Sequence, residues 1–134
     1  MTHDDPRVEL PPPFADERGA IQPILEGLIQ SAQFITSRKG VQRANHYHKQ
    51  DSPSMYVVSG ELDYFWRPAG VEVALSHLRA GPGDLIYTPA RVEHVVEFPT
   101  DAAFVNFSDQ HRDQEAYEAD IVRLSLLVPR IPDL

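Results

Sequence analysis

Two histidines separated by a single residue are the feature of this chain that most directly suggests chemistry. His46 and His48 lie in a segment whose composition predicts a β-strand, and His94 lies in a later segment of the same kind. Side chains at positions i and i+2 of a strand point to one face, so His46 and His48 project together. Three imidazoles that meet on the inner wall of a small β-barrel form either a metal site or an acid/base site.

An arginine precedes the histidine pair in the same predicted strand. Arg43 stands three positions before His46, so in an unbroken strand it faces away from the histidines, whereas a β-bulge would re-aim it. A guanidinium group suits bidentate contact with phosphate. A solvated arginine at the start of a strand is the alternative interpretation.

Six further residues could line a pocket for a ring-shaped ligand. Aromatic side chains in strands are also common core residues, so both interpretations stay open. The six are Tyr47, Tyr56, Tyr64, Trp66, Arg67 and Tyr87.

The elements that carry these residues are predicted to be short strands separated by turns rich in glycine and proline. Such punctuation favours an all-β sandwich or barrel. We expect one short helix at 112–119 and an edge strand or subunit contact at 121–128. Residues 1–13 are predicted to form an extended proline-rich arm, and 14–134 a single domain. The predicted strands are 32–37, 41–48, 54–58, 61–67, 71–78, 84–88, 92–98 and 102–107.

Composition excludes several classes of function. The chain has 134 residues, a net charge of −8 and no cysteine, which argues against a nucleic-acid-binding surface and excludes disulfides. A local arginine patch could still bind a small anionic ligand. No apolar run approaches the ~20 residues that span a bilayer. The acidic N-terminus is unlike a signal peptide, so we expect a cytoplasmic protein without membrane contact.

The spacing of the glycines, proline and histidines resembles the two-part motif of the cupin superfamily. Its first part usually reads G-x5-H-x-H-x(3,4)-E-x6-G and its second G-x5-P-x-G-x2-H-x3-N. Three positions depart from it: Pro53 replaces the metal-binding glutamate, Arg91 the second-motif glycine and Phe98 the asparagine. The resemblance implies a double-stranded β-helix, an antiparallel jelly-roll barrel. The matching residues are Gly40, His46, His48, Gly60, Gly83, Pro89 and His94.

A narrower set of residues is similar to cupins that act on nucleotide-linked keto-sugars. Asp16-Glu17-Arg18-Gly19, with Arg43-x2-His46-x-His48-Lys49, resembles the dTDP-4-keto-6-deoxyglucose 3,4-ketoisomerases and, more distantly, dTDP-4-dehydrorhamnose 3,5-epimerase. Ala44 replaces a glycine of the ketoisomerase pattern. Residues 112–120 are similar to the tail of small epimerase-like cupins. This resemblance implies a homodimer, with the arm or the C-terminal strand at the interface.

Three functions are compatible with these residues. The resemblance favours a keto-sugar isomerase or epimerase in which His46 and His48 are base and acid, Arg43 contacts a phosphate or the developing enolate, and His94 completes the wall. The alternative is a metal-dependent oxygenase, cyclase or isomerase with Zn, Fe, Mn, Ni or Cu on His46, His48 and His94. The third is a small-molecule-binding module without catalysis. Asp51 is a possible replacement carboxylate ligand, but the sequence places it in a loop.

Overall fold

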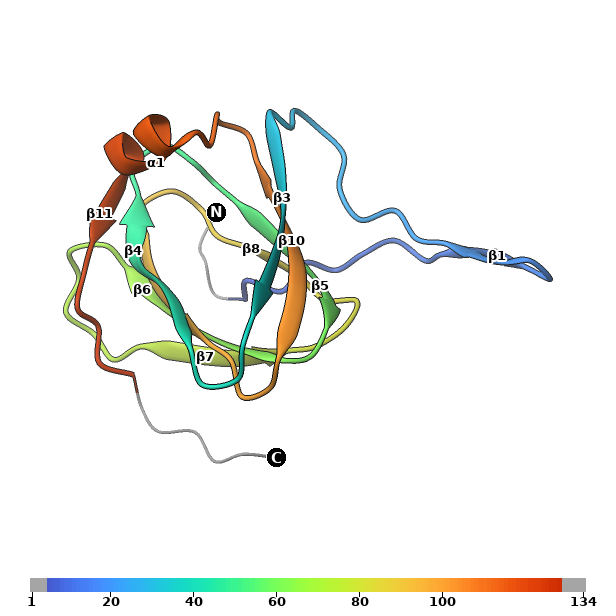
Figure 1. Ribbon diagram of the computed structural model, residues 1–134, viewed down its shortest axis with the longest axis horizontal. Helices are drawn as coiled ribbons and strands as arrows, with labels where there is room; N and C mark the ends of the chain where they lie inside the picture. The colour runs from blue at the N-terminus through green and yellow to red at the C-terminus, as the bar shows by residue number, and fades with distance from the viewer. Residues whose placement is uncertain (1–4, 129–134) are drawn as a thin grey trace.

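The computed structural model describes residues 5–128 and consists of two antiparallel β-sheets that face each other (Figure 1). One sheet has the strand order β3-β10-β5-β8 and the other β11-β4-β9-β6-β7. The elements are β1 (Phe14–Asp16), β2 (Gly19–Ile21), β3 (Ser31–Ser37), β4 (Gln42–His48), β5 (Ser54–Ser59), β6 (Leu62–Pro68), β7 (Ser76–Ala80), β8 (Leu85–Tyr87), β9 (Val92–Glu97), β10 (Ala102–Ser108), α1 (Gln114–Asp120) and β11 (Ile121–Arg123).

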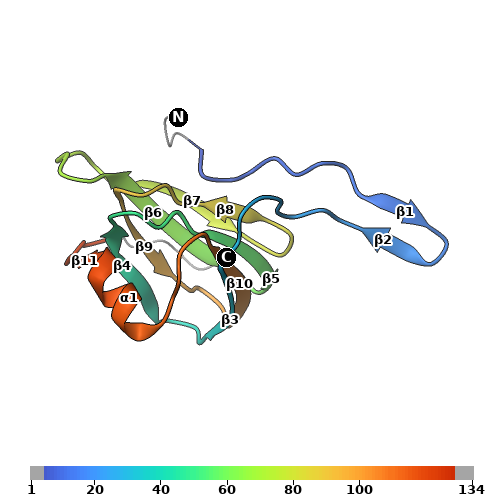
Figure 2. The same cartoon turned by 90° about the horizontal axis from the view of Figure 1, so that it is seen from above.

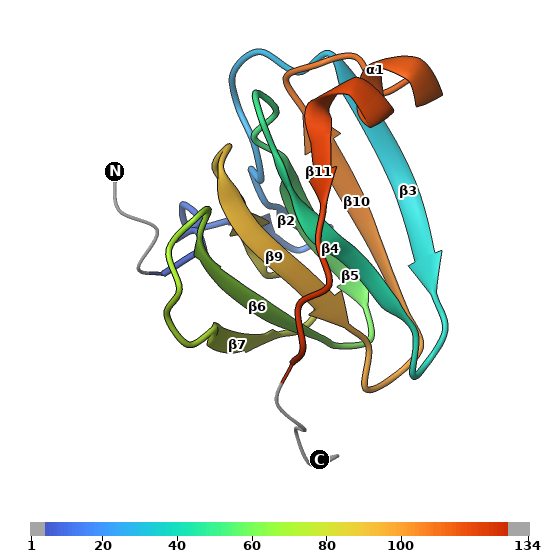
Figure 3. The ribbon, with the colours of Figure 1, turned by 90° about the vertical axis from the view of Figure 1, so that its left-hand side faces the viewer.

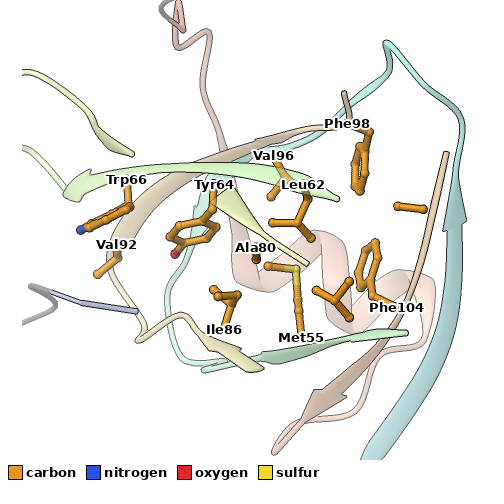
Figure 4. Packing of buried hydrophobic residues seen from close by; sticks show 12 residues of the cluster. Met55, Leu62, Tyr64, Trp66, Ala80, Ile86, Val92, Val96, Phe98 and Phe104 are labelled. Carbon is orange, nitrogen blue, oxygen red and sulfur yellow. The ribbon is translucent and has the colours of Figure 1, made fainter. Parts of the chain in front are cut away.

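The core fills the space between the sheets. Strands alternate inward and outward side chains, and β10 is the clearest case, with buried residues at every second position. From β3 onward, the chain passes to the other sheet after every strand except β6, as in a jelly roll (Figure 3). The predicted all-β antiparallel barrel is therefore confirmed. The buried hydrophobic cluster comprises Met55, Val57, Leu62, Tyr64, Trp66, Ala80, Ile86, Val92, Val96, Phe98, Ala102 and Phe104 (Figure 4).

The N-terminal segment projects further from the barrel than the sequence suggests. Residues 6–8 run beside β8, where Val8 N–H donates to Leu85 O and Tyr87 N–H donates to Pro6 O. The chain then leaves the barrel and forms the hairpin β1–β2, which stands away from both sheets (Figures 1 and 2). The projecting part therefore extends past the predicted limit of residue 13, and the barrel begins at β3.

Two predicted elements differ in extent from those in the structure. The predicted strand 71–78 is wrong in its first half, because Val71 N–H donates to Pro68 O and Val73 N–H to Val71 O, which keeps this stretch in turns. The predicted helix 112–119 is confirmed as α1, which begins after the N-cap Asp113. Among residues 5–128, no helix is long and apolar enough to cross a membrane.

The close approach of two turns explains one motif glycine. Gly60 connects β5 to β6 with φ 74°, and a Cβ atom there would lie 2.0 Å from the carbonyl oxygen of Asp101. No side chain larger than hydrogen fits this contact without moving the backbone. The first-motif glycine is thus required for packing against the turn before β10.

Candidate active site

The three motif histidines form one cluster inside the barrel. His46 and His94 are directly paired across β4 and β9. The ring centroid of His46 lies 4.7 Å from that of His48 and 4.9 Å from that of His94. The side chains of His46, His48 and His94 are 4%, 2% and 5% exposed, and one ring nitrogen of each lies within 4.8 Å of the others. The structure therefore confirms the prediction that the three histidine side chains lie close together.

A β-bulge in β4 sets which residues share the histidine face. Arg43 pairs with Val96 and His46 with His94, so the register shifts by one residue between them. Ala44 and Asn45 take φ values of 65° and 59°, which accommodates the extra residue. Since Val96 and His94 lie on one face of β9, the bulge turns Arg43 to the side of His46.

The guanidinium of Arg43 is nevertheless held against the opposite sheet. Its Nε donates to Ser37 Oγ at 2.7 Å and its Nη2 to the carbonyl oxygen of Thr36 at 2.9 Å. Both acceptors belong to β3. Arg43 thus spans the open side of the barrel, between β3 and β4, at the end away from α1.

A carboxylate orients His48. Asp120, the last residue of α1, accepts a 2.9 Å hydrogen bond at Oδ2 from His48 Nδ1. Burial alone would raise the pKa of Asp120, but hydrogen bonds from His48 and from the backbone N–H groups of Gln50 and Asp51 outweigh it and lower that pKa. A charged Asp120 keeps the proton of neutral His48 on Nδ1, which leaves the lone pair on Nε2.

Burial keeps His46 and His48 neutral. Burial lowers the pKa of His48, and the hydrogen bond to Asp120 offsets only part of that effect. Burial lowers the pKa of His46 to about 2, with further contributions from His94, His48 and the charges of two arginines. His94 donates from Nδ1 to the carbonyl oxygen of Val92 at 2.9 Å. His46 and His48 are therefore uncharged at neutral pH, and neither is a cationic acid there.

Tyr117 of α1 covers the cluster. Its ring centroid lies 6.0 Å from that of His46 and 6.3 Å from that of His48. Burial raises its pKa, while the charges of Arg112, Arg123 and Arg43 lower it. Tyr117 thus keeps its proton at neutral pH.

A buried ion pair fixes the segment before α1. Arg112 Nη1 donates to Asp51 Oδ2 at 2.7 Å, and Ser108 Oγ donates to Asp51 Oδ1 at 2.7 Å. The guanidinium carbon of Arg112 lies 4.8 Å from the ring centroid of Tyr117. Both carboxylate oxygens of Asp51, which was considered above as a replacement metal ligand, therefore accept hydrogen bonds from Arg112 and Ser108. A pocket of about 360 Å³ opens beside this pair and is lined in part by Tyr117 and Asp120.

Two of the six residues predicted to line a ligand pocket lie near the histidines. Tyr64 points into the barrel (Figure 4). Its ring stacks on that of His94 at a centroid distance of 5.9 Å. Its hydroxyl forms a 2.8 Å hydrogen bond with Thr88 Oγ1. Trp66 packs at 5.4 Å from Tyr64. Both are core residues that also form the wall behind His94.

The structure does not bring the other four to the cluster, which corrects the predicted lining. Tyr47 lies between His46 and His48, so strand alternation turns it to the opposite face. Tyr56 alternates in the same way with inward-facing neighbours. Arg67 pairs with Glu93 at 2.8 Å outside the barrel. Tyr87 lines a separate pocket under the N-terminal segment.

Sequence reasoning missed Tyr117, Asp120 and Arg112 as site residues. The available signal was their spacing, because Asp120 stands three residues after Tyr117, one position beyond the predicted helix 112–119, and a helix that continued by one residue would carry both on one face. Nothing in the sequence said where that face docks. The pairing of β11 with β4, which places Ile121 opposite His48, brings the end of α1 to the histidines.

Solved structures similar to this one include enzymes of sugar-nucleotide metabolism. QdtA, a sugar 3,4-ketoisomerase from Thermoanaerobacterium thermosaccharolyticum in complex with TDP, gives a TM-score of 0.73 and 18% identity over 92% of this chain and 90% of that chain. The dTDP-4-dehydrorhamnose 3,5-epimerase from Sulfolobus tokodaii gives 0.63 and 17% identity over 79% and 70% of the two chains. The capsular polysaccharide assembling protein CapF from Staphylococcus aureus gives 0.64 and 17% identity, over 90% of this chain and 35% of that chain.

No protein-family model and no curated protein matches the sequence. At identities of 17% and 18%, the structural similarity shows the fold alone. The facing antiparallel sheets, the turn at Gly60 and the three converging histidines agree with it. This chain has the cupin fold, the double-stranded β-helix that it shares with these ketoisomerase and epimerase structures.

Proposed function

We propose that this protein is an isomerase or epimerase that acts on a keto-sugar carried by a nucleoside diphosphate. The observation that carries the proposal is the His48–Asp120 pair, a neutral buried imidazole whose Nδ1–H is held by a carboxylate. A similar structure, QdtA, is described as a sugar 3,4-ketoisomerase in complex with TDP. Arg112 and Arg123 are paired with Asp51 and Glu118, so Arg43, which binds a hydroxyl and a backbone carbonyl, is the arginine proposed to contact an anionic substrate.

The proposed reaction is proton transfer next to a carbonyl group. His48 Nε2 removes the proton from the carbon α to the keto group, and the C–H electron pair becomes the C=C bond of an enediolate. Asp120 stabilises the imidazolium that forms. Tyr117, which is protonated at neutral pH, returns a proton at the neighbouring atom. His46 stays neutral and forms part of the wall, so in this scheme the acid role expected for His46 or His48 passes to Tyr117.

The test is turnover of TDP-4-keto-6-deoxyglucose in D2O, followed by NMR as deuterium incorporation at the carbon next to the carbonyl. His48→Ala is expected to abolish incorporation and to leave the melting temperature close to that of the wild type. His77→Ala is the matched control, because His77 binds Asp63 outside the barrel. Unchanged turnover in His48→Ala would contradict the proposal. Binding of the substrate without turnover by the wild type would indicate a binding module.

A second candidate is a metal-dependent cupin enzyme, which the histidine geometry also favours. Three buried imidazoles offer one nitrogen each within 4.8 Å of one another, and the hydrogen bond from Nδ1 of His48 leaves its Nε2 lone pair for coordination. The residues therefore fit a divalent ion. Such an ion would act as a Lewis acid beside open coordination positions. Asp51 is held by Arg112 and Pro53 replaces the usual glutamate, so the three histidines would bind it without a carboxylate.

Elemental analysis of the tag-free protein, before and after dialysis against a chelator, separates the two candidates. About one tightly held metal per chain, with activity lost on chelation and restored by metal, would favour the metal-dependent enzyme. Turnover that survives chelation would favour histidine acid/base chemistry without a metal.

We further propose that the protein is a homodimer whose interface includes the projecting hairpin β1–β2. Phe14 and Ile21, which pair across this hairpin, are 62% and 68% exposed. An isolated two-stranded hairpin with apolar exposed side chains is marginal in water. A second copy of the chain would cover this surface.

A further inference from the structure

The inner face of β10 carries a buried amide that has no role in the reaction proposed above. Asn106 is 5% exposed and stands between two other buried positions of β10, Phe104 and Ser108. Its Nδ2 atom has no hydrogen-bond partner among residues 5–128. Buried side-chain donors are nearly always paired, so an unpaired one calls for an explanation. Met55, its neighbour across β5, belongs to the hydrophobic cluster, which confirms that Asn106 points inward.

Asn106 faces the histidine strand from the opposite sheet. At the α1 end of the barrel, Ser108 Oγ donates to Asp51, and a carboxylate oxygen of Asp51 lies within 4.8 Å of a ring nitrogen of His48. At the other end, Lys39 N–H donates to Asp101, which ties the turn before β4 to the turn before β10. The two strands therefore run in the same direction across the barrel (Figure 1).

Two-residue steps along each strand then bring Asn106 level with His46. Ser108 of β10 lies opposite the region around His48 of β4. Two positions earlier on β10 is Asn106, and two positions earlier on β4 is His46; both are buried and face inward. The Nδ1 atom of His46 is also without a hydrogen-bond partner in the described part of the chain. Two buried polar groups thus point from facing sheets toward the same level of the barrel interior, which is how a ligand site places its few orienting polar groups.

We infer that Asn106 is a substrate-contacting residue that donates a hydrogen bond from Nδ2 to the carbonyl oxygen of the keto-sugar. This inference rests on the proposed function. The carbonyl oxygen becomes negatively charged in the enediolate, and a donor fixed in a dry site stabilises that charge without rearranging. A neutral amide suits this position. It can donate a hydrogen bond to the carbonyl oxygen, and it places no charge near His48, which must be uncharged to accept the proton. His48 would then work from one sheet and Asn106 from the other.

Two substitutions separate this role from a structural one. Asn106→Leu removes the amide with little change in volume, and Asn106→Asp keeps the shape but removes the donor. For both we expect kcat for the keto-sugar to fall about 100-fold, with KM changed much less. Because leucine leaves no unpaired donor in the core, Asn106→Leu is also expected to raise the melting temperature by about 3 °C. Val105→Ala, on the outward face of the same strand, is the control and should keep wild-type kcat.

Each outcome decides the inference. A lower melting temperature in Asn106→Leu would show that the amide is held structurally, for example by an ordered water, and would overturn it. Turnover within threefold of the wild type in either variant would overturn it as well, while the proposed function stands. Failure of the wild type to exchange or isomerise the keto-sugar would instead overturn the proposed function, and this inference with it.

Discussion

The backbone N–H of Arg91 donates a 2.7 Å hydrogen bond to the carbonyl oxygen of His48. This bond joins the turn before β9 to the end of β4, and so connects the two halves of the motif directly. Arg91 has φ 62°, in the left-handed region, at the position where the cupin motif usually has glycine. Ala44, which replaces the glycine of the ketoisomerase pattern, has φ 65°. Both departures therefore keep a backbone conformation that glycine adopts freely.

Restoring glycine at position 91 should stabilise the protein. A left-handed conformation costs a non-glycine residue about 1 kcal/mol, and the added flexibility of glycine in the unfolded chain removes about half of that gain. We expect Arg91→Gly to raise the free energy of unfolding by about 0.5 kcal/mol, measured by urea denaturation. Arg91→Ala keeps the strain and should change little. Destabilisation by Arg91→Gly beyond that of Arg91→Ala would refute this account.

Asp120→Asn should alter both the rate and its pH dependence. The carboxylate raises the pKa of His48 against the effect of burial, so its loss lowers that pKa further. The free enzyme needs neutral His48, and the acidic limb of kcat/KM should therefore move to lower pH. A weaker base should also reduce kcat by about 100-fold. A uniform loss at every pH with an unmoved limb would indicate that Asp120 only supports the fold, through its bonds to Gln50 and Asp51.

Folding stability should fall on mild acidification because His46 is buried in its neutral form. Its pKa is about 2 in the folded protein and about 6.5 when unfolded. Above pH 6.5 neither state is protonated, so His46 adds no pH dependence. Below it only the unfolded state binds the proton, and stability drops by up to about 1.4 kcal/mol per pH unit. Thermal melts at pH 7, 6 and 5 should show a shallower decline for His46→Leu. Equal slopes in the two proteins would contradict the neutral burial.

Charge on the hairpin β1–β2 should dissociate the proposed dimer. Phe14→Asp combined with Ile21→Asp places two carboxylates side by side on its exposed surface, because these residues are direct partners. We expect a dimer for the wild type and a monomer for the double variant in light scattering coupled to size-exclusion chromatography. Val73→Asp, on another exposed apolar residue, is the control and should stay dimeric. A monomeric wild type would rule out this interface.

Sequence periodicity predicts orientation within an element better than it predicts which elements dock. The convergence of His46, His48 and His94 follows from strand alternation and motif spacing, and the structure bears it out. The same alternation rule excludes Tyr47 from the cluster, because it stands between the two histidines. The sequence also shows that Arg43 can share the face of His46 only if β4 contains a bulge, because the two residues stand three positions apart.

The contacts between α1 and the histidines are long-range, and the local periodicity of the sequence does not predict them. Asp120 reaches His48 across 72 residues of chain, and Tyr117 depends on the same docking. The hairpin β1–β2 was missed for a related reason, since each of its strands has only three residues and packs on no sheet. The apolar alternation at 71–75 predicted a strand, but the hydrogen bonds to Pro68 and Val71 hold that stretch as turns.

The bulge at Ala44 and Asn45 ties the inner wall of the barrel to the C-terminal segment outside it. Asn45 is fixed from outside, since its backbone carbonyl accepts from Leu124 N–H and its Oδ1 from Leu126 N–H. Removing this one residue would leave Arg43 and His46 two positions apart in an unbroken strand, so they would still point to the same side of the sheet. The two hydrogen bonds to the C-terminal segment would be lost. The extra residue of the bulge therefore anchors residues 124–126 beside β4 without turning Arg43 away from the histidines.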